Sequence, residues 1–264
     1  MTPPRELRIA SLVPSLTELV VALGLAPFLV ARTGFCVHPA VAVAPVPKVG
    51  GTKDVNLEKL RRLSPSHVLV NVDENRLETV EAIRSWPAAP ELVVTHPTDP
   101  EHNLDLVDQL QTVFEAWPGV AAKAAALKGD LQRELDLTRP PGRHAQRVLY
   151  LIWREPWMTV ARDTYLSRML ARVNWQTLPD VNGGSAGAAR YPALTGDEPW
   201  LGAVDQVLLS SEPYRFDPSH VTAAKAICPS ARVRLVDGEL LSWYGARAVP
   251  GLRYLRELAV PGAG

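Results

Sequence analysis

Short apolar runs alternate along the chain with segments whose apolar residues recur every three or four positions. An uninterrupted apolar run between turn residues predicts a buried strand, and the longer spacing predicts a helix with one buried face. Strands are predicted at 7–13, 28–31, 67–70, 92–95, 147–153, 205–210 and 233–236. Helices are predicted at 16–23, 57–63, 76–86, 102–117, 120–137, 164–173, 218–227 and 250–258. This alternation predicts an α/β protein with mainly parallel sheets.

Polar residues and glycines indicate where these elements begin and end. Ser15 or Thr17 is expected to cap the first helix, and Gly24 to close it. Asp163 or Thr164 is expected to cap a helix in the second half of the chain. The segments 33–54 and 237–248 are predicted to be loops, and the glycine-rich segment 182–189 a mobile loop.

The order of elements in the first half is repeated in the second. Each half opens with a strand, a proline-containing loop and a capped helix, and each later has a strand that ends in a polar acidic turn. Residue identity between the halves is weak, so the repeat is one of architecture. The segment 120–137 is rich in helix formers and lacks proline, which favours a long linking helix. We therefore expect two three-layer α/β lobes, 1–118 and 142–264, joined by one rigid helix within 119–141.

In open parallel sheets, ligands bind beyond the carboxyl ends of the strands, so two such lobes would share a cleft. In the first half, Ser15 lies at the start of a helix, where free N–H groups could bind an anionic or carbonyl group of a ligand. A simple helix cap explains Ser15 as well. Cys36 and His38 follow the second strand and suit ligand contact or packing. Glu74 lies in a turn after a central strand, where either a solvated turn or a binding group is expected.

Aromatic residues mark the corresponding positions of the second half. Trp153 and Trp157 flank Arg154 where an apolar strand ends. Indole rings offer stacking area and the guanidinium offers donors, so this combination suits a large flat ligand. Tyr191 follows the glycine-rich loop and Trp243 follows the last strand. The chain has seven Trp and four Phe, a modest tilt toward aromatic residues that face a ligand.

Charge and composition exclude several classes of protein. Lys plus Arg and Asp plus Glu are 28 each, so the formal net charge is zero. This argues against nucleic-acid binding, which depends on neutralising phosphates, and against a polybasic membrane surface. Cys36 and Cys228 are far apart and are interpreted as separate free thiols.

Motifs for catalysis and targeting are missing from the sequence. It contains no G-x-S-x-G elbow, no P-loop and no G-x-G-x-x-G, so we expect a binding protein and not an enzyme. No apolar stretch is long enough to cross a bilayer. The first residues lack the pattern of a secretory signal, so we expect a cytoplasmic protein, or a periplasmic one if a signal has been removed.

Three segments resemble one family of transport receptors: 8–18, RIASLVPSLTE; 47–51, PKVGG; and 56–60, NLEKL. They are similar to the class III, helical-backbone substrate-binding proteins of ABC importers for cobalamin, haem and ferric siderophores. The resemblance covers nearly the whole chain and is closest to the cobalamin-binding branch. It implies two α/β lobes joined by one rigid helix, with limited hinge motion.

The resemblance also implies roles for particular residues. Aromatic side chains clasp the corrin ring in the cobalamin branch, and the candidates by position are Trp153, Trp157 and Trp243, with Ser15, Cys36, His38 and Glu74 nearby. An ABC permease would be the partner, docked through one surface glutamate per lobe. Glu58 matches the first of these glutamates and Glu198 is a looser match to the second.

The ligand is therefore expected to be cobalamin or another metal chelate, with no prosthetic group and no metal site built from protein alone. We expect a monomer. Two alternatives stay open. One is a metal-ion receptor that uses Cys36 and His38, with Glu74 as a further ligand. The other is an enzyme that acts on a corrinoid, with Glu74 or His38 as its base.

Overall fold

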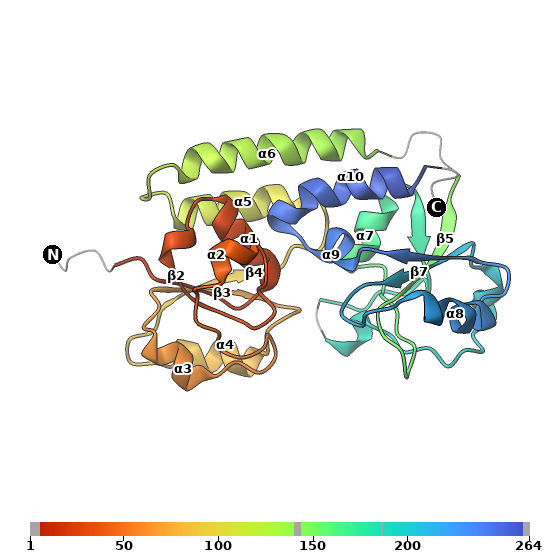
Figure 1. Ribbon diagram of the computed structural model, residues 1–264, viewed down its shortest axis with the longest axis horizontal. Helices are drawn as coiled ribbons and strands as arrows, with labels where there is room; N and C mark the ends of the chain where they lie inside the picture. The colour runs from red at the N-terminus through yellow and green to blue at the C-terminus, as the bar shows by residue number, and fades with distance from the viewer. Residues whose placement is uncertain (1–5, 140–143, 186, 261–264) are drawn as a thin grey trace. The chain divides into compact units, whose positions relative to one another are not determined.

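The protein contains two four-stranded sheets with the same strand order (Figure 1). The computed structural model describes residues 6–139, 144–185 and 187–260. The chain divides into two compact units. The N-terminal unit contains Met1–His96, Leu104–Gly129 and Tyr244–Arg247, and the C-terminal unit contains Pro97–Asn103, Asp130–Trp243 and Ala248–Gly264.

The sheet of the N-terminal unit has the order β2-β1-β3-β4, and every pair is parallel. Its strands are β1 (Ile9–Ser11), β2 (Leu29–Arg32), β3 (His67–Asn71) and β4 (Glu91–Thr95). The register of the central pair places His67 opposite Glu91 and Asn71 opposite Thr95. Since all four strands run the same way, the segments that follow them meet at one carboxyl edge.

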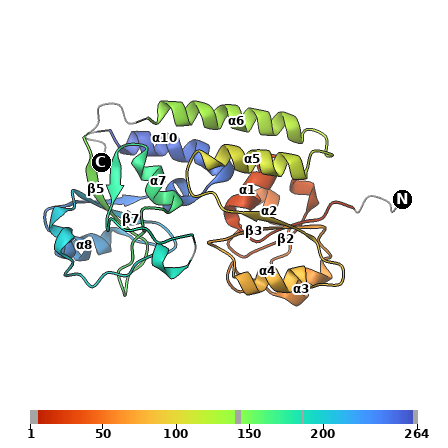
Figure 2. The ribbon, with the colours of Figure 1, turned by 180° about the vertical axis from the view of Figure 1, so that it is seen from behind.

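Helices cover both faces of this sheet (Figures 1 and 2). On one face lie α3 (Leu57–Arg62) and α4 (Leu77–Arg84), whose Leu60 and Ile83 pack against Val68 and Val70 of β3. On the other face lie α1 (Pro14–Ala22) and α5 (His102–Val113). A fifth helix, α2 (Ala40–Val43), is a single turn inside the segment predicted to be a loop.

The sheet of the C-terminal unit has the order β6-β5-β7-β8, again wholly parallel. Its strands are β5 (Gln146–Leu151), β6 (Trp175–Thr177), β7 (Gln206–Ser210) and β8 (Arg232–Val236). Each order places the first strand of its unit beside the second and third, with the fourth at an edge. The predicted α/β class with two parallel sheets and the predicted architectural repeat are therefore confirmed.

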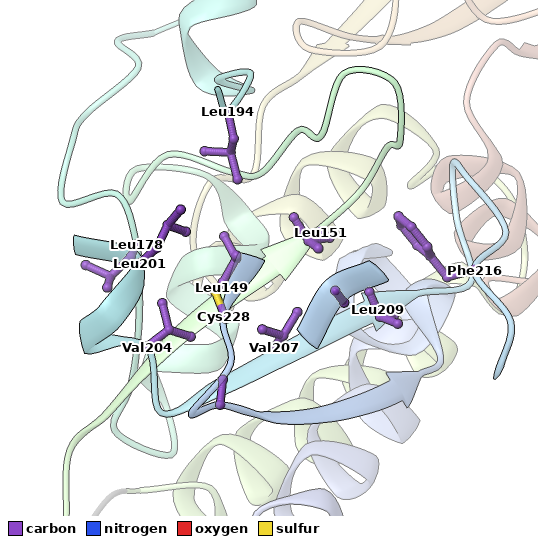
Figure 3. Close-up of a cluster of buried hydrophobic side chains, with 12 residues drawn as sticks. Leu149, Leu151, Leu178, Leu194, Leu201, Val204, Val207, Leu209, Phe216 and Cys228 are labelled. Atoms are coloured by element: carbon purple, nitrogen blue, oxygen red, sulfur yellow. The ribbon is translucent and has the colours of Figure 1, made fainter. Parts of the chain in front are cut away.

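Alternate side chains of β5 and β7 form the core on one face of the second sheet. Leu149 and Leu151 of β5 pack with Val207 and Leu209 of β7, and Cys228 lies among them (Figure 3). This face is covered by α8 (Val221–Ile227). The opposite face carries α7 (Tyr165–Ala171), α9 (Gly238–Ser242) and α10 (Ala248–Leu258). Burial raises the pKa of the Cys228 thiol to about 11, so this cysteine is an apolar packing group.

The predicted linking helix is α6 (Val120–Leu137), with the bounds that the sequence indicated. Its residues up to Gly129 pack with the N-terminal unit and those from Asp130 with the C-terminal unit. Near its end, buried Glu134 accepts hydrogen bonds from Arg253 (2.6 Å) and Arg256 (2.7 Å) of α10. Burial alone would raise the pKa of Glu134, but these two hydrogen bonds lower it overall. This buried ion pair attaches α6 to α10.

Some local predictions were wrong. Neither Ser15 nor Thr17 caps α1, because Val13 is the cap residue and Pro14 opens the helix. The Thr17 hydroxyl instead donates to Ser11 Oγ at 2.8 Å. The prediction of Thr164 as the cap of α7 is confirmed, since its side chain accepts from Ser167 N. The segment 237–248 holds α9, which Asp237 caps.

Strand β6 was not predicted, because three residues are too short to show alternation. Short 3₁₀ turns complete the described elements: η1 (Ala26–Phe28), η2 (Ala188–Arg190), η3 (Pro199–Ala203), η4 (Pro218–His220) and η5 (Gly245–Arg247). Hydrogen bonds hold part of the glycine-rich loop, since Gly183 N and Gly184 N both donate to the Asp163 carboxylate at 2.8 Å. None of the helices described is long and apolar enough to span a membrane.

Candidate functional site

A buried asparagine organises the carboxyl edge of the N-terminal unit. Asn75 accepts from Asn71 N at 2.9 Å and donates to Leu12 O (3.3 Å) and Thr52 O (3.0 Å). It therefore connects the turn after β3 to the segments that follow β1 and β2. Asn71 Oδ1 accepts from Asp73 N at 2.8 Å, which closes the same turn. These bonds fix the backbone that carries Asp73 and the predicted site residue Glu74.

Asp73 and Glu74 each have partners from distant parts of the chain. Lys53 Nζ donates to the carbonyl of Asp73 at 2.6 Å, and His96 Nε2 lies 3.4 Å from its carboxylate. Tyr244 donates its hydroxyl to Glu74 Oε1 at 2.8 Å. Burial and then the charge of Glu74 raise the pKa of Tyr244 well above its ordinary value, so the phenol keeps its proton. The result is a network of polar groups at the ends of β3 and β4.

Cys36 lies beneath this edge in the core. Its Sγ is 3.1 Å from Thr33 Oγ1 and 3.9 Å from Ser11 O, and the residue is 1% exposed. Burial raises the pKa of the thiol, against hydrogen bonds from Thr17 and Thr33. Since the thiolate is the form that binds metals, a neutral buried thiol is a packing group here. His38 is half-buried two residues on.

Exposed apolar side chains stand at the same edge, and sequence reasoning did not select them. Phe35, Val37 and Val72 are 63%, 45% and 40% exposed. Phe35 and Val37 lie three and five residues after the end of β2, and Val72 follows β3 directly, so the rule that ligands bind beyond strand ends would have found them. The predicted residue Ser15 is buried in the first turn of α1. The edge therefore combines a polar network with uncovered apolar groups.

A short antiparallel ladder brings four predicted residues of the C-terminal unit into one region. Trp153 pairs with Met158, and Met158 pairs with Ala193. Met158 N donates to Trp153 O at 3.1 Å, and Leu194 N donates to Trp157 O at 2.7 Å. The hairpin after β5 thus carries Trp153, Arg154 and Trp157, and the segment paired with it begins beside Tyr191.

Ring contacts fix the side chains of this hairpin. Trp157 stacks on Phe216 with centroids 5.9 Å apart and an interplanar angle of 9°. Trp153 meets Tyr214 edge to face at 5.6 Å, and Arg154 Cζ lies 5.7 Å from the centroid of the Trp157 ring. Trp153 remains 42% exposed. We call these five residues the aromatic hairpin cluster; it presents an indole and a guanidinium where β5 and β7 end.

Trp243 has a different environment from the other predicted tryptophans. It is 8% exposed, and its Nε1 donates to Glu212 Oε1 at 2.7 Å. Ser242 Oγ donates to the same oxygen at 2.6 Å. Burial raises the pKa of Glu212, and the hydrogen bonds from Ser242 and Trp243 lower it in part. Sequence reasoning missed Glu212, although it lies two residues after the end of β7, as Asp73 lies two residues after the end of β3.

A separate depression of about 280 Å³ lies in the N-terminal unit. Its lining residues come from the segments that precede β3 and β4, so it lies at the amino edge of the sheet: Arg61, Ser64, Pro65, Trp86, Pro87 and Ala88. Across the described ranges, no three His, Cys, Asp or Glu side chains are grouped so that they could hold a metal ion.

Comparison with known sequences identifies the family. The profile of the periplasmic binding proteins matches residues 9–178, more than half of the chain. The chain belongs to the periplasmic binding protein family. Among curated proteins, this binding protein is 24% identical over 272 residues to the uncharacterized ABC transporter substrate-binding lipoprotein YvrC of Bacillus subtilis strain 168, covering 96% of this chain and 80% of YvrC. The prediction of a substrate-binding protein, and not an enzyme, is confirmed by this membership.

Solved structures share the fold over almost the whole chain. The periplasmic vitamin B12 binding protein BtuF of Vibrio cholerae matches with a TM-score of 0.76 and 17% identity, over 96% of this chain and 98% of BtuF. The periplasmic heme-binding protein RhuT from Roseiflexus sp. RS-1 matches with a TM-score of 0.77 and 19% identity, over 98% and 99%. A periplasmic heme binding protein from Pseudomonas aeruginosa matches with a TM-score of 0.75 and 22% identity, over 97% and 94%.

The two glutamates predicted to dock a permease differ in their surroundings. Glu58 is exposed on α3 and pairs with Arg62 one turn later. Glu198 accepts from Thr195 N (2.6 Å) and Gly196 N (3.0 Å). Burial raises the pKa of Glu198, but the backbone donors of this turn lower it overall. Glu198 therefore stabilises its own turn.

Proposed function

We propose that this binding protein is the receptor of an ABC importer and that its ligand is a metal-bearing organic chelate of the cobalamin or heme type. The curated relative is named as an ABC transporter substrate-binding lipoprotein, and the structures with the same fold bind vitamin B12 or heme. These similarities support the class of ligand; the groups at the two carboxyl edges support its chemistry.

The aromatic hairpin cluster is the observation that carries the proposal. An exposed indole offers a flat apolar surface to a macrocycle. The guanidinium of Arg154 offers donors to carboxylate or amide groups at the rim of such a ring. A flat chelate with polar substituents fits both groups.

The carboxyl edge of the N-terminal unit carries groups that suit the same class of ligand. Phe35 and Val72 offer apolar contacts, and Asp73 and Glu74 offer acceptors for the amides or hydroxyls of a ligand. In this proposal each carboxyl edge offers groups that suit such a chelate. The metal arrives with its own ligands, which agrees with the buried, protonated thiol of Cys36. The alternative of a bare metal-ion receptor at Cys36 and His38 therefore has no support from the described residues.

Docking to a permease is proposed through Glu58, whose carboxylate is exposed. A Glu58→Ala variant would bind ligand as the unmodified protein does and would fail to stimulate transport in a reconstituted importer. Glu198→Ala is expected to weaken its turn as well, so Glu58 is the cleaner variant.

Isothermal titration calorimetry with cyanocobalamin, hemin and a ferric hydroxamate chelate tests the ligand. We expect one of them to bind with a Kd of about 1 μM or tighter. Trp153→Ala should weaken that binding about tenfold, since an exposed aromatic anchor typically contributes more than 1 kcal/mol. Trp86→Phe, at the opposite edge of the other sheet, is the matched control and should bind normally. If the unmodified protein binds none of the three, the proposal is wrong.

A further inference from the structure

One short segment from the end of the chain packs into the N-terminal unit. Tyr244–Arg247 belongs to that unit, although the residues on both sides of it, up to Trp243 and from Ala248, belong to the C-terminal unit. We call this segment the strap. It contains η5 and begins two residues after the end of α9.

An ion pair and a close backbone approach seat the strap on α1. Arg247 Nε and Nη2 donate to the two carboxylate oxygens of Glu18, each at 2.7 Å. The two side chains are 14% and 17% exposed. Such a bidentate pair is stronger and more directional than a single contact.

Gly245 allows this approach. Its φ is +71°, and a Cβ at this position would lie 3.3 Å from Leu19 Cβ and 3.5 Å from Ser15 O. A side chain would therefore be strained and crowded at once. The strap contacts α1 closely because it has glycine at this point.

Tyr244 extends the strap from α1 to the turn after β3. The residue is 6% exposed, and its hydroxyl donates to Glu74 Oε1 at 2.8 Å. Glu74 adjoins Asp73, which interacts with Lys53 and His96. The strap thus touches the ends of two neighbouring strands, β1 through α1 and β3 through its turn.

We propose that Tyr244 is a positioning residue of the ligand site: it fixes the carboxylate of Glu74 at the edge that receives the ligand. This inference rests on the proposed function. A carboxylate that is held by a buried donor has one orientation before the ligand binds. Binding then costs less conformational entropy, because this side chain does not have to be ordered. The edge of the N-terminal unit is then completed by a residue encoded about 170 positions away from Glu74.

The test compares Tyr244→Phe with Tyr254→Phe. Tyr254 of the C-terminal unit also has a hydrogen-bonded hydroxyl, which accepts from Asp237 N at 3.0 Å, so it is a matched control. Tyr244→Phe removes one hydroxyl and should weaken binding of cyanocobalamin or hemin about three- to tenfold, as loss of one hydrogen bond to a charged group does. Tyr254→Phe should leave the Kd unchanged.

Two further variants separate positioning from a general effect on the fold. Tyr244→4-aminophenylalanine restores a donor at the end of the ring and should recover most of the affinity. In a Glu74→Ala background, Tyr244→Phe should have no further effect on Kd, because the group that it positions is missing.

The inference would be overturned if Tyr244→Phe left the Kd unchanged. It would also be overturned if Tyr244→Phe weakened binding equally in the Glu74→Ala background. In both cases the proposed function stands. Failure of the unmodified protein to bind cyanocobalamin, hemin and the ferric hydroxamate chelate would contradict the proposed function and this inference with it.

Discussion

The two sheets share strand order and a local turn, yet their carboxyl edges have different chemistry. After β3, the side chain of Asn71 accepts from Asp73 N, and after β7 the hydroxyl of Ser210 accepts from Glu212 N at 3.2 Å. In both units, the last residue of a central strand thus fixes a backbone N–H of an acidic residue two positions later.

The neighbours of these acids make the edges different. Asp73 is half-buried and interacts with Lys53 and His96. Glu212 accepts hydrogen bonds from Ser242 and Trp243, and burial raises its pKa in spite of these bonds. The same hydrogen bond to the backbone therefore places an acidic residue two positions after each central strand. The side chains packed around that residue decide whether its carboxylate is available to a ligand.

Among the three variants, Trp157→Ala should cause the largest loss of stability. The ring is stacked on Phe216 and packed against the core of the second sheet, so its loss should lower the free energy of unfolding by about 3 kcal/mol. Urea unfolding measures the change. Trp153→Ala is the control and should cost about 1 kcal/mol or less, because much of that ring is exposed. Equal losses of unfolding free energy in both variants would contradict this expectation, because they would mean that both rings are packed equally in the core.

Asn75→Ala, at the carboxyl edge of the N-terminal unit, should cause a smaller loss of stability. It leaves Asn71 N, Leu12 O and Thr52 O without their present partner, at a cost of about 2 kcal/mol. Hydrogen exchange should quicken in β3 and β4 and not in β5 and β7. Asn182→Ala, at an exposed loop position, is the control. Uniformly faster exchange in all four strands would contradict a role confined to one edge.

Glu212→Gln should have the smallest effect on stability. It should be visible as a change in the pH dependence of Tm. A carboxyl whose pKa is raised on folding stabilises the folded state at low pH, and this contribution is lost as the pH rises through the raised value. The Tm of the unmodified protein should therefore fall a few degrees more between pH 5 and 8 than that of the variant. Gln keeps an acceptor for Ser242 and Trp243. The exposed acid Glu78, changed to Gln, should not alter the profile; equal profiles for all three proteins would refute the expectation.

Local patterns in the sequence determined the α/β class, the bounds of α6 and the repeat of the two halves. They also placed Trp153, Arg154 and Trp157 on one loop, because a hairpin brings together residues that are close in the chain. Only the tertiary structure decided the partners of Glu74 and Glu18, which are 170 and 229 residues away. It also decided that Trp243 is buried on Glu212. Periodicity reports which face of an element is buried; it carries no information about which distant segment covers that face, since that depends on how whole elements pack.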